Sequence, residues 1–245
     1  MAIELVEQTI AAHGGLGLWQ AADELSARVS SGGLAFATKL QGRAVRDVQA
    51  RVSTREQHVV MTPYPKPGQR GVLLPDGTVR IETDDGQMLE SRERAREAFA
   101  GLRHKLWWDR LDILYFATYA MWTYLSTPFV FARPDYQVRE LEEWVEGGER
   151  WRRLHVIFPE HIHTHSREQV FYIDANGLIR RHDYTAEPLG SFAKAAHYCL
   201  DHESFDGLVV PTQRRVYPRK RDNRRRAGPL LVWISIPNAN VVYSR

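Results

Sequence analysis

Three histidines alternate with other residues in the segment His161-Ile162-His163-Thr164-His165, and a carboxylate, Glu168, follows closely. On an extended strand alternate side chains share a face, so the three imidazoles would form a row on one side of a sheet. Two neutral imidazoles and a carboxylate suit zinc or iron with one position open for a substrate. One interpretation is therefore a divalent metal held by His161, His163 and Glu168. The alternative is that Pro159 starts a loop whose histidines lie exposed at a sheet edge or cavity mouth, with no cofactor.

A second group of reactive side chains lies in Arg180-Arg181-His182-Asp183-Tyr184. Strand alternation places Arg180, His182 and Tyr184 on one face and Arg181 and Asp183 on the other, so only one set can face an interior. A histidine near a carboxylate is a ready general base. If the strand of His165 pairs with this hairpin, His165, His182 and Tyr184 meet in a pocket. The candidates for acid–base catalysis are His163, His165, His182, Asp183 and Tyr184.

The segment 105–125 has the strongest helical pattern in the chain and is rich in aromatic residues. Its apolar residues almost encircle the helix, which predicts that it is buried on most sides. It is too short to cross a bilayer, which takes ~20 apolar residues. We expect it to contribute contacts to an apolar ligand, or simply to pack the core. The candidate contacts are Trp107, Tyr115, Tyr119 and Trp122, joined by Tyr172 and Arg181 from the later hairpin.

The rest of the chain reads mainly as strands between turn sequences. A helix over 3–12 ends at two glycines, and 28–31 with 34–40 resembles a hairpin. Further strands are expected at 45–53, 57–62, 71–74, 78–83, 87–90, 137–146, 150–158, 168–173 and 178–187, and a last hairpin at 208–217 and 230–235. A polar helix capped by Ser91 would reach Phe99, and 193–203 fits either a helix or a strand. No repeat or linker divides the chain, so a single domain over 1–245 is predicted.

Composition narrows the classes of protein. With 43% hydrophobic and 26% charged residues, the chain is expected to fold into a globular core. A single cysteine, Cys199, excludes an intramolecular disulfide, and the acidic first residues do not resemble a secretory signal, so a cytoplasmic location is expected. The net charge of +3 comes largely from residues 219–226. Such a run in one loop does not indicate nucleic-acid binding.

The order of elements, and the hairpin sequence Val170-Phe171-Tyr172-Ile173-Asp174-x-x-Gly177-Leu178-Ile179-Arg180-Arg181-x-Asp183-Tyr184, resemble the lipoprotein carriers of the LolA and LolB type. The opening Ala12-His13-Gly14-Gly15-x-x-x-x-Trp19 looks like the first helix of relatives of this fold. The resemblance implies a curved, incomplete barrel that closes over helices and holds acyl chains in an apolar hollow. Those carriers are periplasmic and made with a signal sequence, so lipoprotein shuttling is not implied here.

The sequence therefore predicts a mainly β (α+β) fold: a strongly curved antiparallel sheet or incomplete β-barrel around an aromatic-rich central helix, with an N-terminal helix. The predicted function is binding of an apolar small molecule, such as an acyl, polyketide-like or terpene-like compound, in the hollow of the sheet. The alternative is an enzyme that uses the same pocket for isomerisation, cyclisation, hydration or elimination. The free edges of an open barrel could also pair two copies into a homodimer.

Overall fold

All strands of the computed structural model, which describes residues 2–101, 104 and 106–243, belong to one antiparallel sheet. The sheet has thirteen strands in the order β6-β5-β4-β3-β2-β1-β13-β12-β11-β10-β9-β8-β7, and every neighbouring pair is antiparallel. β6 and β7 each pair on one side alone, so the sheet is open. The predicted fold class is confirmed.

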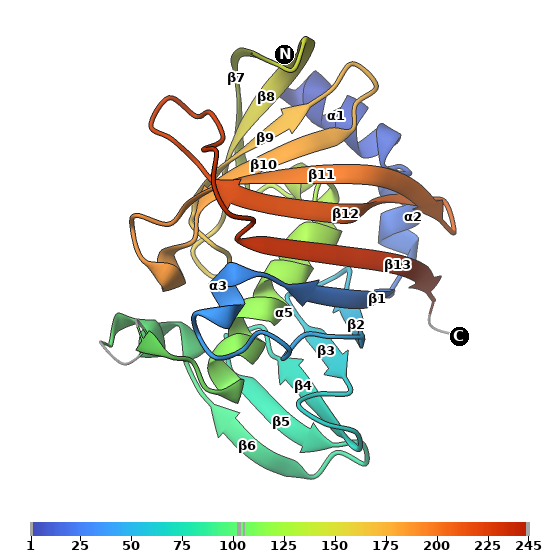
Figure 1. The fold of residues 1–245 in the computed structure, drawn as a ribbon. Coiled ribbons are helices and arrows are strands. Elements are labelled where there is room, and N and C mark those ends of the chain that lie inside the picture. The colour runs from blue at the N-terminus through green and yellow to red at the C-terminus, as the bar shows by residue number, and fades with distance from the viewer. Residues whose placement is uncertain (1, 102–103, 105, 244–245) are drawn as a thin grey trace.

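The first half of the chain forms one wing of the sheet and the second half the other, with β1 and β13 joining them (Figure 1). The first wing contains β1 (Glu24–Gly32), β2 (Val48–Ser53), β3 (Val59–Thr62), β4 (Gln69–Leu73), β5 (Val79–Thr83) and β6 (Met88–Arg92). The second contains β7 (Gln137–Glu146), β8 (Glu149–Ile157), β9 (Glu168–Ile173), β10 (Ile179–Thr185), β11 (Lys194–Phe205), β12 (Leu208–Pro218) and β13 (Val232–Val242).

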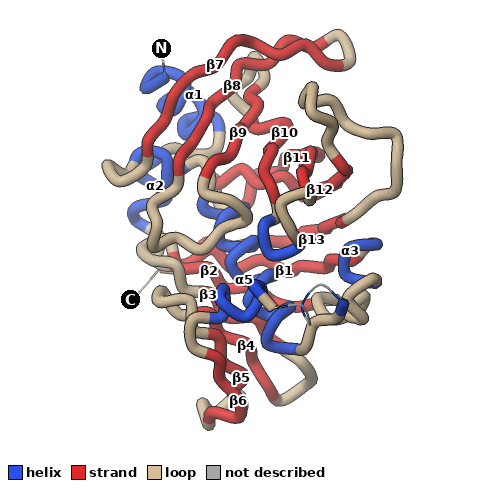
Figure 2. The backbone as a smooth tube through the Cα atoms, turned by 90° about the vertical axis from the view of Figure 1, so that its left-hand side faces the viewer, coloured by secondary structure: helices blue, strands red, loops and turns tan. Residues whose placement is uncertain are grey.

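Helix α5 (Arg110–Ser126) lies inside the curve of this sheet, as the two views of Figures 1 and 2 show together. It packs against β2, β3, β4 and β5, and every residue from Leu111 to Ser126 is buried. Helix α1 (Ala2–Ala12) contacts β7, and helix α2 (Leu16–Ala21) follows it in the chain. No helix in the described part of the chain combines the length and apolar character needed to cross a membrane.

The central helix begins later than the sequence pattern predicts. Asp109 accepts hydrogen bonds from the backbone amides of Leu111 and Asp112, and the Asp112 carboxylate accepts the Asp109 amide in return. This capping box sets the first turn at Arg110, because it satisfies amides that lack a helical partner. Residues 107–109 are consequently not helical, and residue 105 lies outside the described residues.

Two other expectations are wrong. Residues 34–37 form the short helix α3 (Leu34–Ala37) instead of a strand. Gly33 before it has φ +128°, and a Cβ there would lie 2.4 Å from the carbonyl oxygen of Leu231, so the chain turns away from the sheet at this glycine. Ser91 belongs to β6 and caps no helix; the 3-10 helix η1 (Ala95–Ala100) follows. The ambiguous segment 193–203 is strand β11.

The histidine segment 161–165 is a loop between β8 and β9, so its three histidines do not form a row on a strand. Side chains, and not a neighbouring strand, hold its backbone. The side-chain amide of Gln57 accepts a hydrogen bond from the His163 N–H and donates one to the His163 carbonyl, each at 2.7 Å. Arg96 donates to the carbonyl of Thr164 at 2.6 Å. Pro159 has no amide proton to continue the β8 ladder, which explains where the strand ends.

Candidate ligand pocket

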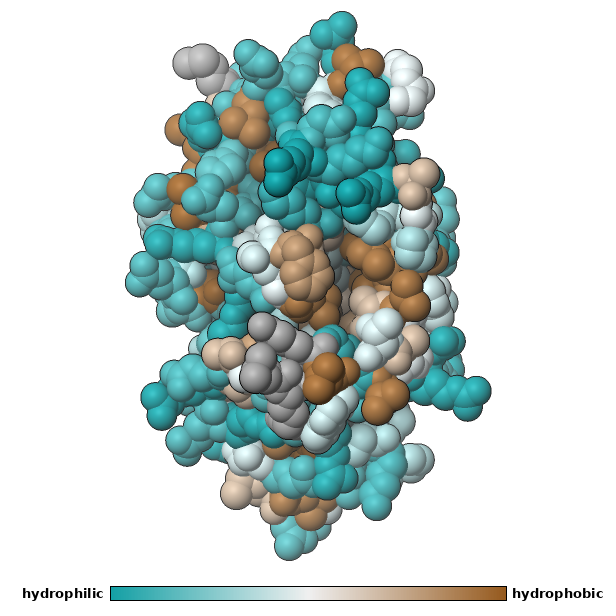
Figure 3. All heavy atoms as spheres, turned by 60° about the vertical axis from the view of Figure 1, so that its left-hand side comes forward, coloured by the Kyte–Doolittle hydropathy of each residue, from teal (hydrophilic) through white to brown (hydrophobic). Residues whose placement is uncertain are grey.

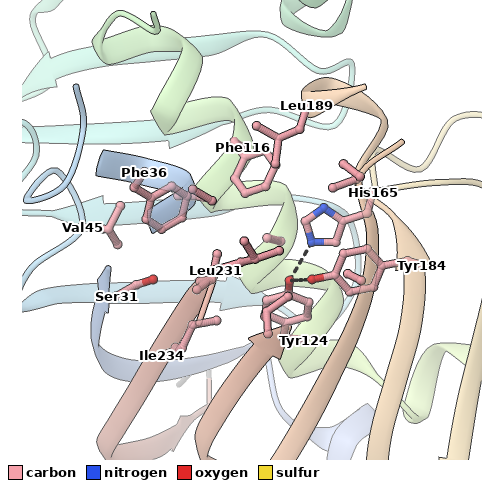
Figure 4. Close-up of a pocket in the computed structure, with 18 of the residues that line it drawn as sticks. Ser31, Phe36, Val45, Phe116, Tyr124, His165, Tyr184, Leu189, Leu231 and Ile234 are labelled. Carbon is pink, nitrogen blue, oxygen red and sulfur yellow. Dashed lines mark hydrogen bonds between the residues drawn. The ribbon is translucent and has the colours of Figure 1, made fainter. Parts of the chain in front are cut away.

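An apolar pocket opens between helix α5 and the part of the sheet formed by β1, β10, β11, β12 and β13. The space between its walls is about 620 Å³ with the open mouth included, and about 60 Å³ of it admits the centre of a water molecule, so the pocket is a narrow slit. Figure 3 shows apolar side chains gathered around a hollow in the middle of one face. Figure 4 shows the lining; its apolar residues include Phe36, Val45, Phe116, Met121, Leu189, Leu231 and Ile234.

Small residues on α5 create the room. Ala117 and Ala120 face the slit between the larger Phe116, Met121 and Tyr124. Positions 117, 120, 121 and 124 are spaced as one stripe of a helix. An alanine in a close-packed interior leaves space that a Leu or Phe would fill. The stripe therefore forms one wall of the pocket, opposite the alanines of β11 and the loop before it.

One end of the slit is polar. The hydroxyl of Tyr124 lies 2.6 Å from His165 Nε2 and 3.1 Å from the hydroxyl of Tyr184 (Figure 4). The His165 ring stacks on Tyr184 with centroids 4.0 Å apart and planes 8° from parallel. These three side chains line the pocket together, whereas most of its remaining wall is apolar. They give a bound molecule a place for one polar group.

The network continues behind this wall. His165 Nδ1 is 3.1 Å from the Tyr119 hydroxyl, and the Tyr184 hydroxyl is 3.3 Å from His197 Nδ1. Each neutral imidazole has one N–H and one lone pair, so a change of tautomer at His165 must reverse the direction of the bonds along the chain. His197 Nε2 is buried at its far end and has no hydrogen-bond partner within the described part of the chain.

Burial keeps these imidazoles uncharged. Desolvation lowers the pKa of His165, His182 and His197 well below 6.5, and the positive charge of Arg214 adds to this at His182 and His197. Burial raises the pKa of Tyr119 and Tyr184 well above 10. At neutral pH the polar end of the pocket is thus a set of neutral donors and acceptors.

The two faces of β10 separate as strand alternation predicts. His182 stacks on Phe171 at 4.1 Å, bonds the Gln169 side chain, and lies with its ring centroid 4.9 Å from Tyr184. His165, His182 and Tyr184 are thus brought together on the inner face. Their catalytic role stays a prediction.

The outer face of β10 carries Arg181 and Asp183, which are fully buried although they point away from the hollow. Arg181 holds Asp183 through two bonds of 2.7 and 2.8 Å and Glu146 through a third of 2.5 Å. The Tyr172 hydroxyl donates to Asp183 at 2.9 Å, and its ring lies 4.6 Å from the Arg181 guanidinium. Asn223, in the basic loop 219–226, accepts from Arg181 as well.

Comparison with known proteins identifies the architecture. No family model matches the chain, and no curated protein matches it in sequence. Among solved structures, a LolA-superfamily protein from Nitrosomonas europaea superposes with a TM-score of 0.54 at 9% identity, over 100% of this chain and 95% of that one. A putative outer membrane lipoprotein-sorting protein domain from Vibrio parahaemolyticus gives 0.54 at 10% identity, over 98% and 92%. The chain has a LolA-like fold.

A DUF1329-family protein from Desulfovibrio piger superposes equally well, with a TM-score of 0.54 at 11% identity over 98% of this chain and 92% of that one. Identities this low establish the LolA-like fold and nothing about the ligand. The coverage extends over both wings of the sheet and the central helix, so the resemblance seen in one hairpin and the first helix holds for the whole architecture.

The residues that the sequence predicts as ligand contacts do not line the pocket. Tyr172 and Arg181 point to the outer side of the LolA-like sheet, because their parity on β9 and β10 places them opposite His182. Trp122 is a core residue whose indole donates to the carbonyls of Ser53 and Glu56. Trp107 is 43% exposed and does not line the pocket.

Tyr115 and Tyr119 are buried on α5 but reach the histidine loop instead of the pocket. The Tyr115 hydroxyl is 2.7 Å from His163 Nδ1, and burial raises the pKa of this tyrosine to about 12. The pocket is bordered instead by another stripe of the helix, and the only sign of that stripe in the sequence is the pair Ala117 and Ala120 among large neighbours.

The candidate metal ligands are not assembled. His161 is mostly exposed with Nε2 3.8 Å from Asp135, His163 bonds Tyr115, and Glu168 accepts from His155 at 3.0 Å on the outer surface. Each faces a different partner because the segment is a loop. Across residues 2–101, 104 and 106–243, no three His, Cys, Asp or Glu side chains are grouped to hold a metal ion.

Proposed function

We propose that this protein binds an apolar small molecule in the slit between α5 and strands β10–β13. The observation that carries the proposal is the lining itself: a pocket within the curve of the sheet whose walls are alanine, valine, leucine, isoleucine, methionine and phenylalanine, with polar groups gathered at one end. Affinity would come from apolar area removed from water, at roughly 25 cal/mol per Å².

The shape of the pocket favours a thin ligand. Its volume of about 60 Å³ is well below the ~300–1,000 Å³ usual for small-molecule sites, so a ligand must be thin or must move the side chains of the walls apart. An acyl chain, or a flat polyketide-like or terpene-like compound, fits a slit better than a globular molecule does. Tyr124, His165 and Tyr184 would receive a single hydroxyl or carbonyl group at the polar end of the slit.

Two further facts support an apolar ligand. Leu34 and Phe192, next to the lining residues Ala35 and Ala193, are 44% and 83% exposed, so apolar surface continues outside the slit. One of the structures sharing the fold is described as a putative lipoprotein-sorting domain, and lipoproteins carry acyl chains. The fold is thus compatible with apolar cargo.

The catalytic alternative gains no support from this arrangement. An acid–base pair must exchange a proton with a substrate, whereas both nitrogens of His165 are bonded to the hydroxyls of Tyr119 and Tyr124. His182 is bonded to Gln169 behind the wall. The side chains hold one another in place, which suits the orientation of a bound polar group.

The test compares two alanines of helix α3. Ala35 lines the slit and Ala37, two residues further on, is exposed and does not. We expect Ala35→Phe to fill the mouth and weaken binding of a fluorescent fatty-acid probe at least tenfold, with Ala37→Phe binding as the wild type does. Native mass spectrometry of the protein as purified would reveal a co-purifying molecule. Equal affinity in both variants would place the ligand elsewhere.

A further inference from the structure

Arg214 on β12 is a buried cation that pairs with no carboxylate among residues 2–101, 104 and 106–243. Its side chain points to the inner face of the sheet, and the residue is 3% exposed. The guanidinium Nη2 donates to the carbonyl of Tyr124 at 2.9 Å, and Nη1 lies 3.3 Å from Cys199 Sγ. Its Nε is buried with no hydrogen-bond partner among the described residues. Arginine cannot shed its proton in a protein, so its charge must be balanced in place.

The groups around Arg214 offset part of this charge. Tyr124 belongs to the last turn of α5, where carbonyls have no helical partner and the helix dipole presents roughly half a negative charge. The Tyr124 ring, 4.8 Å from the guanidinium carbon, adds a cation–π contact. Burial raises the pKa of the Cys199 thiol, which favours its neutral form. None of these groups is an anion, and the Nε–H has no hydrogen-bond partner among the residues that the structure describes.

A small cavity lies beside this guanidinium. Its polar walls are His13, Thr127, His182, Cys199 and Arg214, and no carboxylate lines it. It offers about 10 Å³ for the centre of a water-sized sphere, which is the room for a single water molecule or monatomic ion. The cavity is distinct from the apolar slit, since the two share no lining residue.

We propose that this cavity holds one monatomic anion of chloride size, bound to the Nε–H of Arg214. A water molecule would satisfy the Nε–H but leave the charge, whereas a halide satisfies both. Sulfate, phosphate and the carboxylate head of a lipid are too large for the space. The site is independent of the proposed cargo and would tie β12 to the end of α5.

The direct test is a crystal of the full-length protein grown with sodium bromide, examined at the bromine absorption edge. We expect an anomalous peak beside the Arg214 side chain in the cavity walled by His13 and Cys199. A water molecule there, without an anomalous peak, would overturn the proposal. This test uses the wild-type protein and does not depend on any variant folding.

Solution measurements supply the matched control. Thermal unfolding is compared in sodium chloride and sodium gluconate at equal ionic strength. We expect a higher melting temperature in chloride for the wild type, and loss of that difference in Arg214→Met. Arg215→Met changes the neighbouring arginine, which bonds Gln213 on the opposite face, and should keep the wild-type difference. A chloride effect of equal size in all three proteins would contradict specific binding at Arg214.

Discussion

The two faces of strand β10 bury polar groups in opposite ways. On the inner face, His182 and Tyr184 join a network of neutral histidines and tyrosines beside the apolar slit. On the outer face, Arg181 and Asp183 form a charged network with Glu146. Neighbouring residues of one strand thus belong to two separate buried networks. The residues of the inner network are neutral, and those of the outer network are charged.

This division fits the neighbours of each face. A neutral network places no net charge beside an apolar ligand, so a molecule in the slit need not face a desolvated ion. The ionic network instead links β10 to the end of β7 through Glu146 and to the loop 219–226 through Asn223. Function would be sensitive to the inner face and stability to the outer one.

The largest expected effect comes from breaking the outer network. Arg181→Met leaves the buried Asp183 carboxylate without its main partner, and removing one member of a buried pair typically costs ~3–5 kcal/mol. We expect a loss of that order in the free energy of unfolding, measured by urea denaturation. Binding in the slit should persist in the fraction that is folded.

The adjacent Arg180 is the control. Its ion pair with Asp174 is long, at 3.9 Å, and partly exposed, so Arg180→Met should cost at most ~1 kcal/mol. The double variant Arg181→Met, Asp183→Leu should recover part of the loss, because the fully buried carboxylate is removed together with its main partner, while Glu146 still loses its bond from Arg181 and Arg219 its contact with Asp183. Similar losses for Arg180→Met and Arg181→Met would show that the outer network is not a special source of stability.

The buried histidines of the inner face should make the free energy of unfolding depend on pH. Histidines 165, 182 and 197 have pKa values far below 6.5 when folded, His13 about 4 and His202 about 3, all because burial opposes the charged form. As the pH falls below ~6.5, the unfolded chain takes up protons that the folded one does not, so stability is lost with acidification. Each such histidine contributes ~1.4 kcal/mol per pH unit to the slope.

His182→Gln should therefore reduce this slope by about one histidine's share, measured by urea unfolding at pH values between 7 and 5. The substitution replaces the imidazole by a group that does not titrate. A slope that His182→Gln does not change would mean that the folded protein accommodates the imidazolium.

The sequence predicted the strand alternation that separates these faces. It predicted that His165 meets His182 and Tyr184 only if His165 lay on a strand paired with this hairpin, whereas a loop brings His165 there. It also predicted most strands and the buried helix, since periods of 2 and 3.6 are local properties, whereas the curvature of the sheet was implied only by the resemblance to the LolA and LolB carriers. It could not predict which stripe of α5 borders empty space. The position of this stripe depends on where the second wing of the sheet approaches the helix. Because nearly all faces of the helix are apolar, its apolar pattern does not distinguish the stripe that borders the pocket.

The histidine loop shows the same limit. Alternation in 161–165 resembles a strand, but the conformation is set by Gln57 and Arg96, which lie over sixty residues away in the sequence. The α3 turn likewise depends on contact of Gly33 with Leu231. Long-range contacts decided both cases, through side chains in the histidine loop and through close approach of two backbone segments at Gly33.

The smallest effect, and the finest view of the inner network, is expected from removing hydroxyl groups. Tyr124→Phe and Tyr184→Phe should each cost ~1 kcal/mol of unfolding free energy, the usual net value of one hydrogen bond. The two hydroxyls bond each other at 3.1 Å, so either substitution already removes their shared bond. The double variant should therefore cost less than the sum, by 0.5 kcal/mol or more in a double-mutant cycle.

A control cycle pairs Tyr124→Phe with Tyr217→Phe, a tyrosine of the outer face whose ring lies under Arg225 at 4.1 Å. These two changes share no partner and should add. The inner hydroxyls would also orient a ligand's polar group, so the Tyr124 and Tyr184 variants should weaken binding of a fatty alcohol more than that of an alkane of equal length. Additive costs in the Tyr124–Tyr184 cycle, with equal loss for alcohol and alkane, would reduce the inner network to ordinary core packing.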